Sequence, residues 1–204
     1  MKNGKSKILN LIIKLLIVFI GVFAAFLLND YRNDKSESNE IRKSYKLISE
    51  DLDWYIKAGT ENNRDGFINL FQNFHDETIL LKEKKELPIG FGLLGDYWNI
   101  ELINSMLISG KLNNIDPEIF KEVSRFHTVH QNMINQIDKY NLYYDEQVVP
   151  NLDKGVNEFY VWNTNEFKIK YKRLLTYQST ILGLSKSTVE FAEELKIEIE
   201  SKYL

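Results

Sequence analysis

The hydrophobic residues of this chain follow two patterns: one nearly unbroken run near the amino terminus, and a helical repeat after it. Residues 8–28 form an apolar run that only Asn10 and Lys14 interrupt. A helix of this length is about 31 Å long, which matches the ~30 Å hydrocarbon core of a bilayer. The run therefore predicts one transmembrane helix over residues 8–28.

The residues on either side of this run predict its direction in the membrane. Three lysines precede it with no acidic residue, and basic and acidic residues mix after it. Because basic residues resist translocation, we expect residues 1–7 to form a cytoplasmic basic tail and residues 29–204 an extracytoplasmic domain. The competing interpretation is a secretory signal that is cleaved after Ala24.

Two small residues, Gly21 and Ala25, lie one turn apart on the predicted span. Small side chains at this spacing allow two helices to pack closely, although they are also common in membrane helices that do not dimerise. The pair is therefore the candidate contact for a homodimer.

After residue 40 the apolar residues recur in steps of three and four, which is the spacing of one face of an α-helix. The first two stripes consist of Ile41, Tyr45, Ile48, Leu52 and Tyr55, and of Phe67, Phe71, Phe74, Thr78 and Leu81. Residues 59–66, which are rich in turn formers, predict a break between these two helices.

Local signals place two helices in the middle of the chain. A short helix is predicted over residues 97–109, with Asp96 as its N-cap and Gly110 after its end, where glycine readily adopts a left-handed backbone. Its inward residues are expected to be Trp98, Leu102, Ile103 and Met106. Asp116-Pro117 predicts the N-cap and first residue of a longer helix that extends to about Glu146. The stripe of that helix is Ile119, Val123, Phe126, His130, Met133, Ile137, Tyr140 and Tyr144.

The last helix is predicted from a capping pattern, Asn163 with Glu166 three residues later. Its stripe consists of Phe167, Tyr171, Leu174, Ile181, Ala192, Leu195 and Ile199, with Gln178 and Ser185 as interruptions. No segment alternates convincingly at the period of a strand. We therefore predict an all-α fold, with one N-terminal transmembrane helix followed by an antiparallel helical bundle.

Charge and composition exclude several classes of function. Four of the 26 basic residues lie in residues 1–28, so residues 29–204 hold 22 basic and 29 acidic side chains, a net charge of −7. This balance repels phosphate backbones, and we expect no nucleic-acid partner. The chain has no cysteine, which excludes disulfides, thiolate nucleophiles and cysteine-built zinc sites.

Residues 90–95 match the pattern G-x-G-x-x-G. That pattern binds a dinucleotide only where a strand leads into it and a helix follows, and here a charged helix end with Pro88 precedes it. We interpret the segment as a loop between two helices.

His127 and His130 are three residues apart on a predicted helix, a spacing that can place two imidazoles on one metal ion. A third ligand would come from Glu122 or from residues 75–77. His130, however, lies on the apolar stripe, where a core histidine explains it equally well. The aromatic residues 143–144 and 159–162 are likewise expected in the core rather than in a ligand cage. We assign no catalytic, cofactor-binding or metal residue, and we expect no cofactor.

Two stretches resemble a family of small bacterial single-span proteins of unknown function. The first is the end of the span with the helix after it, FIGVFAAFLLNDYRND and IRKSYKLISEDL, and the second is YWNIELINSMLISGKLNNIDPEIFKEVSRFH. In the second stretch the residues that match are Leu102, Ser109, Gly110, Leu112 and Ile115. The chain departs from the family at Tyr31, where the family often has Trp. The resemblance implies membrane attachment and a helical body, and it implies no catalytic residue.

These observations favour a non-enzymatic, membrane-anchored helical module that binds membrane or envelope proteins, or supports an envelope complex. With the resemblance, we expect it in a bacterial inner membrane, with its body facing the periplasm. Two alternatives stay open. One is an exported, sensor-like domain that binds a small ligand between its helices and acts through a partner. The other is a metal-dependent enzyme that uses His127, His130 and nearby acids.

Overall fold

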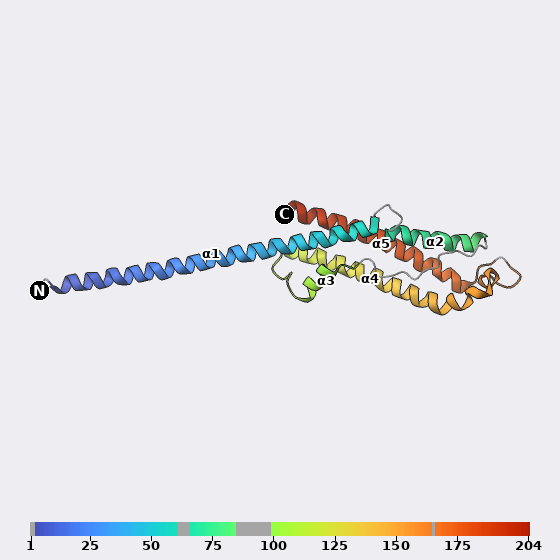
Figure 1. Ribbon diagram of the computed structural model, residues 1–204, viewed down its shortest axis with the longest axis horizontal. Coiled ribbons are helices and arrows are strands. Elements are labelled where there is room, and N and C mark those ends of the chain that lie inside the picture. Colours follow the sequence, from blue (N-terminus) through green and yellow to red (C-terminus); the bar gives the residue numbers. More distant parts are fainter. Residues whose placement is uncertain (1–2, 61–65, 85–98, 165) are drawn as a thin grey trace. The chain divides into compact units, whose positions relative to one another are not determined.

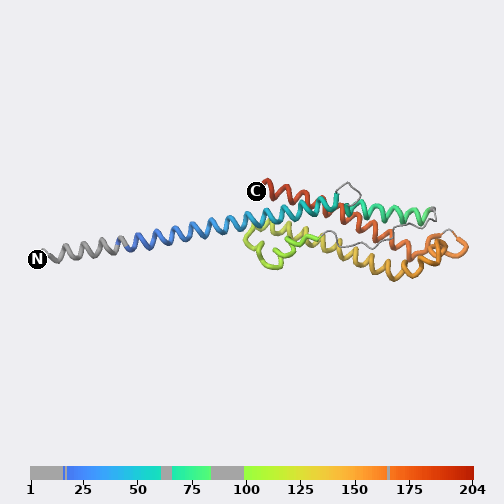
Figure 2. Tube along the Cα trace, in the orientation of Figure 1, coloured from blue at the N-terminus to red at the C-terminus, as the bar shows by residue number. Residues whose placement is uncertain are grey.

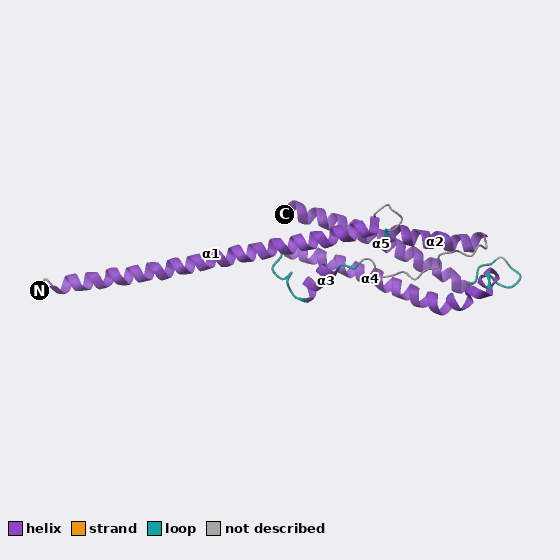
Figure 3. Ribbon diagram, in the orientation of Figure 1, coloured by secondary structure: helices purple, strands orange, loops and turns teal. Residues whose placement is uncertain are grey.

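Five α-helices make up most of the computed structural model, which describes residues 3–60, 66–84, 99–164 and 166–204 (Figure 1). They are α1 (Asn3–Thr60), α2 (Phe67–Lys84), α3 (Glu101–Ile108), α4 (Pro117–Gln147) and α5 (Ile169–Tyr203), with two 3-10 helices, η1 (Val149–Lys154) and η2 (Val156–Phe159), between α4 and α5. The described residues include no strand (Figure 3), so the predicted all-α fold is confirmed. The contacts divide the chain into two units, residues 1–43 and residues 44–204.

The first unit consists of the amino-terminal part of α1. Its side chains are described for Leu16 and for residues 18–43, and the large apolar ones up to Leu28 are 51–67 % exposed. The side chains of residues 1–15 and of Ile17, which belong in part to the predicted span, lie outside the described part of the chain. Among the residues that are described, no helix contains a stretch both long and apolar enough to cross a membrane.

The second unit, which we call the body, is a helical bundle. Helix α5 packs along α4 and α2, and α3 lies on α4. Two ring contacts show that α4 and α5 are antiparallel, because Phe126 contacts Phe191 at a centroid distance of 6.1 Å and Tyr143 contacts Tyr177 at 5.7 Å. Figure 2 shows the chain reversing between these two helices through η1, η2 and the segment after them.

The predicted stripes form the core of the body. Every stripe residue of α2 and α4 is buried, as are the last four of the α1 stripe. Tyr55 of α1 lies at a junction of rings, with centroids 5.4 Å from Phe67 of α2 and 5.5 Å from Phe126 of α4. The 3.6-residue period therefore identified the buried faces of these three helices correctly.

Gln178 and Ser185, predicted to interrupt the stripe of α5, are instead buried members of it. The Nε2 of Gln178 donates to Thr78 Oγ1 (2.9 Å) and to the hydroxyl oxygen of Tyr140 (3.2 Å). Ser185 donates to the carbonyl oxygen of Ile181 (2.7 Å). The Gln178 Nε2 and the Ser185 hydroxyl thus have partners in the core, and the Gln178 amide links α2, α4 and α5. The Gln178 Oε1 is buried and has no hydrogen-bond partner among the described residues.

Two helix ends in the middle of the chain are as predicted. The Asp116 side chain accepts from the N–H groups of Glu118 (2.8 Å) and Ile119 (3.4 Å), and Pro117 is the first residue of α4. Gly110 follows α3 with a φ of +70°, a left-handed conformation that favours glycine.

The start of α3 differs from its prediction. The helix begins at Glu101 after Ile100, whose side chain makes no capping hydrogen bond. Residues 96–98, including the predicted N-cap and an inward tryptophan, lie outside the described part of the chain. Leu102, predicted to point inward, is 40 % exposed, whereas Ile103 and Met106 are buried as expected.

The start of α5 was predicted wrongly. Asn163 is not a helix cap but adopts a φ of +58° in a turn, and the N-cap of α5 is Lys168. Phe167, predicted on the helical stripe, forms an isolated antiparallel bridge with Tyr160. A chain reversal of this kind closes through backbone pairing, which a search for helix caps does not detect.

Candidate functional site

The three histidines of the chain have separate surroundings. His127 of α4 shares a hydrogen bond with Asn104 of α3, with 2.8 Å between Nε2 and Oδ1. His75 of α2 is joined to Ser179 of α5, with 3.1 Å between Nε2 and Oγ. Each of these two imidazoles therefore connects a different pair of helices.

His130 lies in the core, in agreement with the interpretation of this residue as a core histidine. It is 1 % exposed, and its ring is 5.4 Å from that of Tyr55 and 6.3 Å from that of Phe126. Glu122, named above as a further candidate ligand, pairs with Arg125 at 3.5 Å. Among the described residues no group of three or more His, Asp or Glu side chains is placed to hold a metal ion. The glycine-rich residues 90–95 lie outside the described part of the chain.

A buried carboxylate, Asp51, fixes α3 to α1. Its Oδ2 accepts the backbone N–H of Ile103 at 2.9 Å, which supplies the cap that Ile100 does not. Burial raises the pKa of Asp51, and the N–H groups of Ile103 and Leu102 oppose that rise. The cap comes from another helix, so no local sequence signal at α3 could have predicted it.

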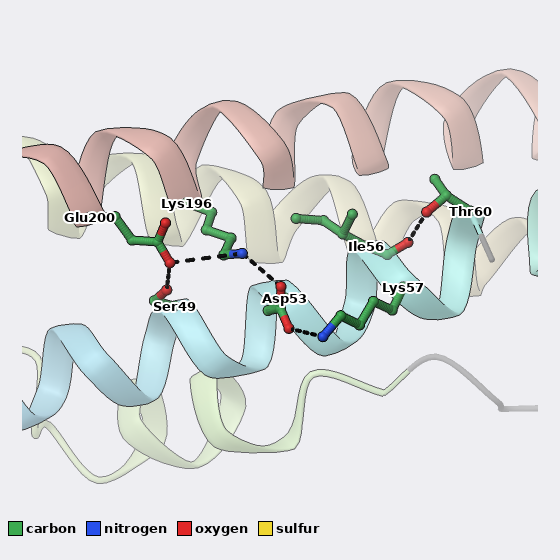
Figure 4. A network of polar contacts seen from close by, with 7 residues as sticks. All are labelled: Ser49, Asp53, Ile56, Lys57, Thr60, Lys196 and Glu200. Atoms are coloured by element: carbon green, nitrogen blue, oxygen red, sulfur yellow. Dashed lines mark hydrogen bonds and ion pairs between the residues drawn. The ribbon is translucent and has the colours of Figure 1, made fainter.

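A second carboxylate on the same helix, Asp53, belongs to a network that joins α1 to α5 (Figure 4). Its two oxygens lie 2.6 Å from Lys196 Nζ and 2.6 Å from Lys57 Nζ. Ser49 donates to Glu200 at 2.7 Å, and Lys196 lies 3.8 Å from the same carboxylate. Hydrogen bonds from Lys196 and Lys57 lower the pKa of Asp53. This network is a contact between two helices.

Tyr45 connects the beginning of the body to its end. Its ring stacks on that of Tyr203, with centroids 4.3 Å apart, and its hydroxyl oxygen accepts the backbone N–H of Asp116 at 2.9 Å. The pKa of Tyr45 is raised mainly by burial. Through Tyr45, the first turn of α1 within the body contacts the start of α4 and the last turn of α5.

Between η2 and α5 the chain forms a tight hairpin, which is orange in Figure 2. Its base is closed by the N–H of Val161 donating to the Glu166 carbonyl (2.8 Å) and by the N–H of Lys168 donating to the Phe159 carbonyl (2.9 Å). Tyr160 and Phe167 are buried beneath it, with ring centroids 5.6 Å apart.

Trp162, at the turn of this hairpin, is 86 % exposed, although it was predicted to belong to the core. The aromatic patch 159–162 is therefore divided: Phe159 and Tyr160 are buried, whereas Val161 and Trp162 point outward. The signal for the hairpin in the sequence is the run of turn formers Asn163, Thr164 and Asn165 directly after the patch.

Compared with protein-family models, with curated proteins and with solved structures, the chain has no match in any of the three. The resemblance to single-span bacterial proteins therefore stays a prediction. Any functional conclusion depends on the residues and contacts of this chain itself.

Proposed function

We propose that this chain is a membrane-anchored helical module, held in the bilayer by residues 8–28, whose extracytoplasmic body binds other proteins without catalysis of its own. The supporting observation is the exposure of α1 between residues 16 and 28. Its large described side chains there are all apolar and all at least half exposed: Leu16, Val18, Phe19, Ile20, Val22, Phe23, Phe26, Leu27 and Leu28.

These side chains project around the full circumference of the helix, because consecutive residues are 100° apart and almost every position is occupied. A helix that is apolar all round needs apolar surroundings on every side. A hydrocarbon environment would supply such surroundings. The first charged residue after Lys14 is Asp30, which marks the outer edge of the span.

The polar groups of the body support a role in binding rather than catalysis. Asp51 caps α3, His127 and His75 connect helices, and the Gln178 amide bonds to two hydroxyl groups in the core. These groups, which are typical of active sites when they converge, are used here one at a time to hold helices together.

Alkaline carbonate washing of membrane vesicles that carry the full chain tests the anchor. We expect the chain to stay in the pellet, and the double variant Ile20→Lys/Phe23→Lys to move to the supernatant, because each lysine at the centre of a span costs about 3 kcal/mol. The matched control is Leu142→Lys/Ile197→Lys, which changes two body side chains of similar exposure (61 % and 66 %) and should stay in the pellet. Release of the unaltered chain by carbonate would contradict the anchor.

Crosslinking in intact cells, followed by gentle detergent extraction, tests the second half of the proposal. We expect the chain to co-purify with other envelope proteins through crosslinks to residues of the body. A chain that is monodisperse after extraction and captures no protein would contradict a role in protein binding.

A further inference from the structure

The buried stripes of α2, α4 and α5 share a repeat that allows more than one register between these helices. In each stripe the steps alternate between three and four residues, so the pattern returns to itself after seven residues. The residues of α5 that follow this repeat are Tyr171, Leu174, Gln178, Ile181, Ser185, Thr188, Ala192, Leu195 and Ile199. If α5 moved along its neighbours by seven residues, about 10.5 Å, buried positions would again lie against buried positions. The spacing of the stripes therefore does not determine a single register.

One layer of the bundle distinguishes these registers, because its buried side chains are polar. It consists of Thr78 of α2, Tyr140 of α4 and Gln178 of α5, each at most 2 % exposed, and we call it the polar layer. The Nε2 of Gln178 donates to Thr78 Oγ1 at 2.9 Å and to the hydroxyl oxygen of Tyr140 at 3.2 Å. Both acceptors belong to other helices, so both bonds depend on the position of α5 along α2 and α4. In a register seven residues away, the amide would be buried without these two acceptors.

Ser185, one repeat further along α5, shows that a buried polar side chain need not carry this information. It is fully buried, and its hydroxyl donates to the carbonyl oxygen of Ile181 at 2.7 Å, within the same helix. Its contact with α4 is with Met133 Sδ at 3.3 Å, and a thioether is a weak acceptor. The main hydrogen bond of Ser185 would therefore survive a shift of α5, whereas both bonds of the Gln178 amide would be lost.

The polar layer is not the most stable arrangement that three buried side chains could adopt. The Gln178 Oε1 is buried without a hydrogen-bond partner among the described residues. Exchanging a set of bonded polar groups for apolar groups of similar shape is often neutral or stabilising. Natural proteins keep such polar groups where they exclude alternative arrangements.

We propose that the polar layer selects the register of α5 against α2 and α4, because it makes registers seven residues away unfavourable. A single buried polar residue fixes the register of a coiled coil in the same way. Ion pairs such as that of Lys196 with Asp53 also join α5 to α1, but their side chains are 25 % and 35 % exposed and solvent weakens them. The inference depends neither on the amino-terminal anchor nor on a partner of the body.

Cysteine crosslinking of the full chain in detergent micelles tests this selection, because the unaltered chain has no cysteine. His75→Cys on α2 is combined in turn with Ser179→Cys, Lys172→Cys or Lys186→Cys on α5. His75 contacts Ser179 in the observed register, with 3.1 Å between Nε2 and Oγ, and the two lysines lie seven residues to either side of Ser179. With the polar layer intact, we expect a short bifunctional maleimide to join the observed pair at least about tenfold faster than either shifted pair.

An apolar layer should weaken this preference. In the variant Thr78→Val/Tyr140→Phe/Gln178→Leu, the crosslinking rates of the shifted pairs, relative to that of the observed pair, should rise about tenfold, because no buried amide loses its acceptors. The body should unfold at a urea concentration no lower than before. Ser185→Ala is the matched control and should leave the rates unchanged. Unchanged relative rates in the apolar variant would overturn the proposal, and so would a clear loss of its stability.

A swap of two side chains provides the second variant and keeps the composition of the chain. In Gln178→Ser/Ser185→Gln, the glutamine matches Thr78 and Tyr140 only after a shift of α5 by seven residues. Crosslinking from position 75 should therefore increase at position 186 and not at position 172. A swapped chain that crosslinks at position 179 as fast as the unaltered chain, with no increase at position 186, would overturn the proposal.

Discussion

The two parts of α1 differ in how their apolar side chains are distributed and covered. Between residues 18 and 28 these side chains surround the helix and are at least half exposed. Between residues 44 and 60 one face of the helix is buried, where Tyr45, Ile48, Leu52 and Tyr55 are at most 3 % exposed, whereas Trp54 on the other side is 47 % exposed. The arrangement of apolar residues around the helix, more than their number, therefore distinguishes a helix that packs on other helices from one that needs apolar surroundings.

Replacing one leucine by alanine in each part of α1 should give the largest difference in stability between the two parts. Leu52→Ala should lower the free energy of unfolding of the body by about 2–5 kcal/mol, because the fully buried side chain leaves a cavity. Leu27→Ala, at a position that is 54 % exposed, should change it by less than about 0.5 kcal/mol. Urea unfolding in mild detergent, followed by circular dichroism, measures both. Equal losses for the two variants would contradict the division of α1 at the start of the body.

The glycines of α1 provide a second matched pair. A Cβ on Gly59 would lie 2.6 Å from Val189 Cγ2 of α5 and 3.0 Å from the Phe67 ring, whereas a Cβ on Gly21 would meet nothing within 4 Å. Gly59→Ala should therefore destabilise the body by about 1–3 kcal/mol, although alanine favours a helix. Gly21→Ala should leave the unfolding of the body unchanged.

Relief of the clash at Gly59 is the control for this second prediction. In the double variant Gly59→Ala/Val189→Ala the contact with Cγ2 is removed, so the double variant should lose less stability than the sum of its two single variants. Simple additivity of the two losses would show that Gly59 is not held by close packing against α5.

The sequence predicted the parts of this fold that depend on local chemistry. The period of the apolar residues identified the buried faces of α2 and α4, and Asp116 and Gly110 marked two helix ends, because each signal acts within a few residues. The features it missed depend on contacts between distant residues. Asp51 caps α3 from another helix, and Gln178 is tolerated in the core because Thr78 and Tyr140 accept its hydrogen bonds.

The candidate site was harder to predict for the same reason. The histidines matched a metal-binding spacing, yet their partners come from other helices, and no residue near His127 indicated Asn104 as its neighbour. The exposure of Trp162 depends on the hairpin, whose closure pairs residues on both sides of a turn. An aromatic run beside turn formers is compatible with both a buried and an exposed tryptophan until that pairing is known.

The smallest expected effects come from two carboxylates of α1, whose pKa values are shifted in opposite directions by their contacts in the body. Lys196 and Lys57 hold the pKa of Asp53 below its ordinary value of 3.8. Its contribution to stability is therefore complete above that value and is lost as the pH falls through the folded-state pKa. Because Asp53 is 35 % exposed, Asp53→Asn should cost at most about 1 kcal/mol near neutral pH, and less in acid.

The contribution of Asp51 to stability depends on pH in the opposite direction, because burial raises the pKa of this residue above 3.8. A carboxyl group with a raised pKa contributes its full share to stability below the unfolded value, and that share is lost as the pH rises through the folded-state pKa. The stability advantage of the unaltered chain over Asp51→Asn should therefore shrink as the pH rises above the ordinary value of 3.8, whereas its advantage over Asp53→Asn should persist there and fall only in stronger acid. Urea unfolding of the three proteins at a series of pH values measures both differences. Parallel pH dependences for the two variants would contradict the opposite pKa shifts, and with them the contacts of Asp51 with α3 and of Asp53 with α5.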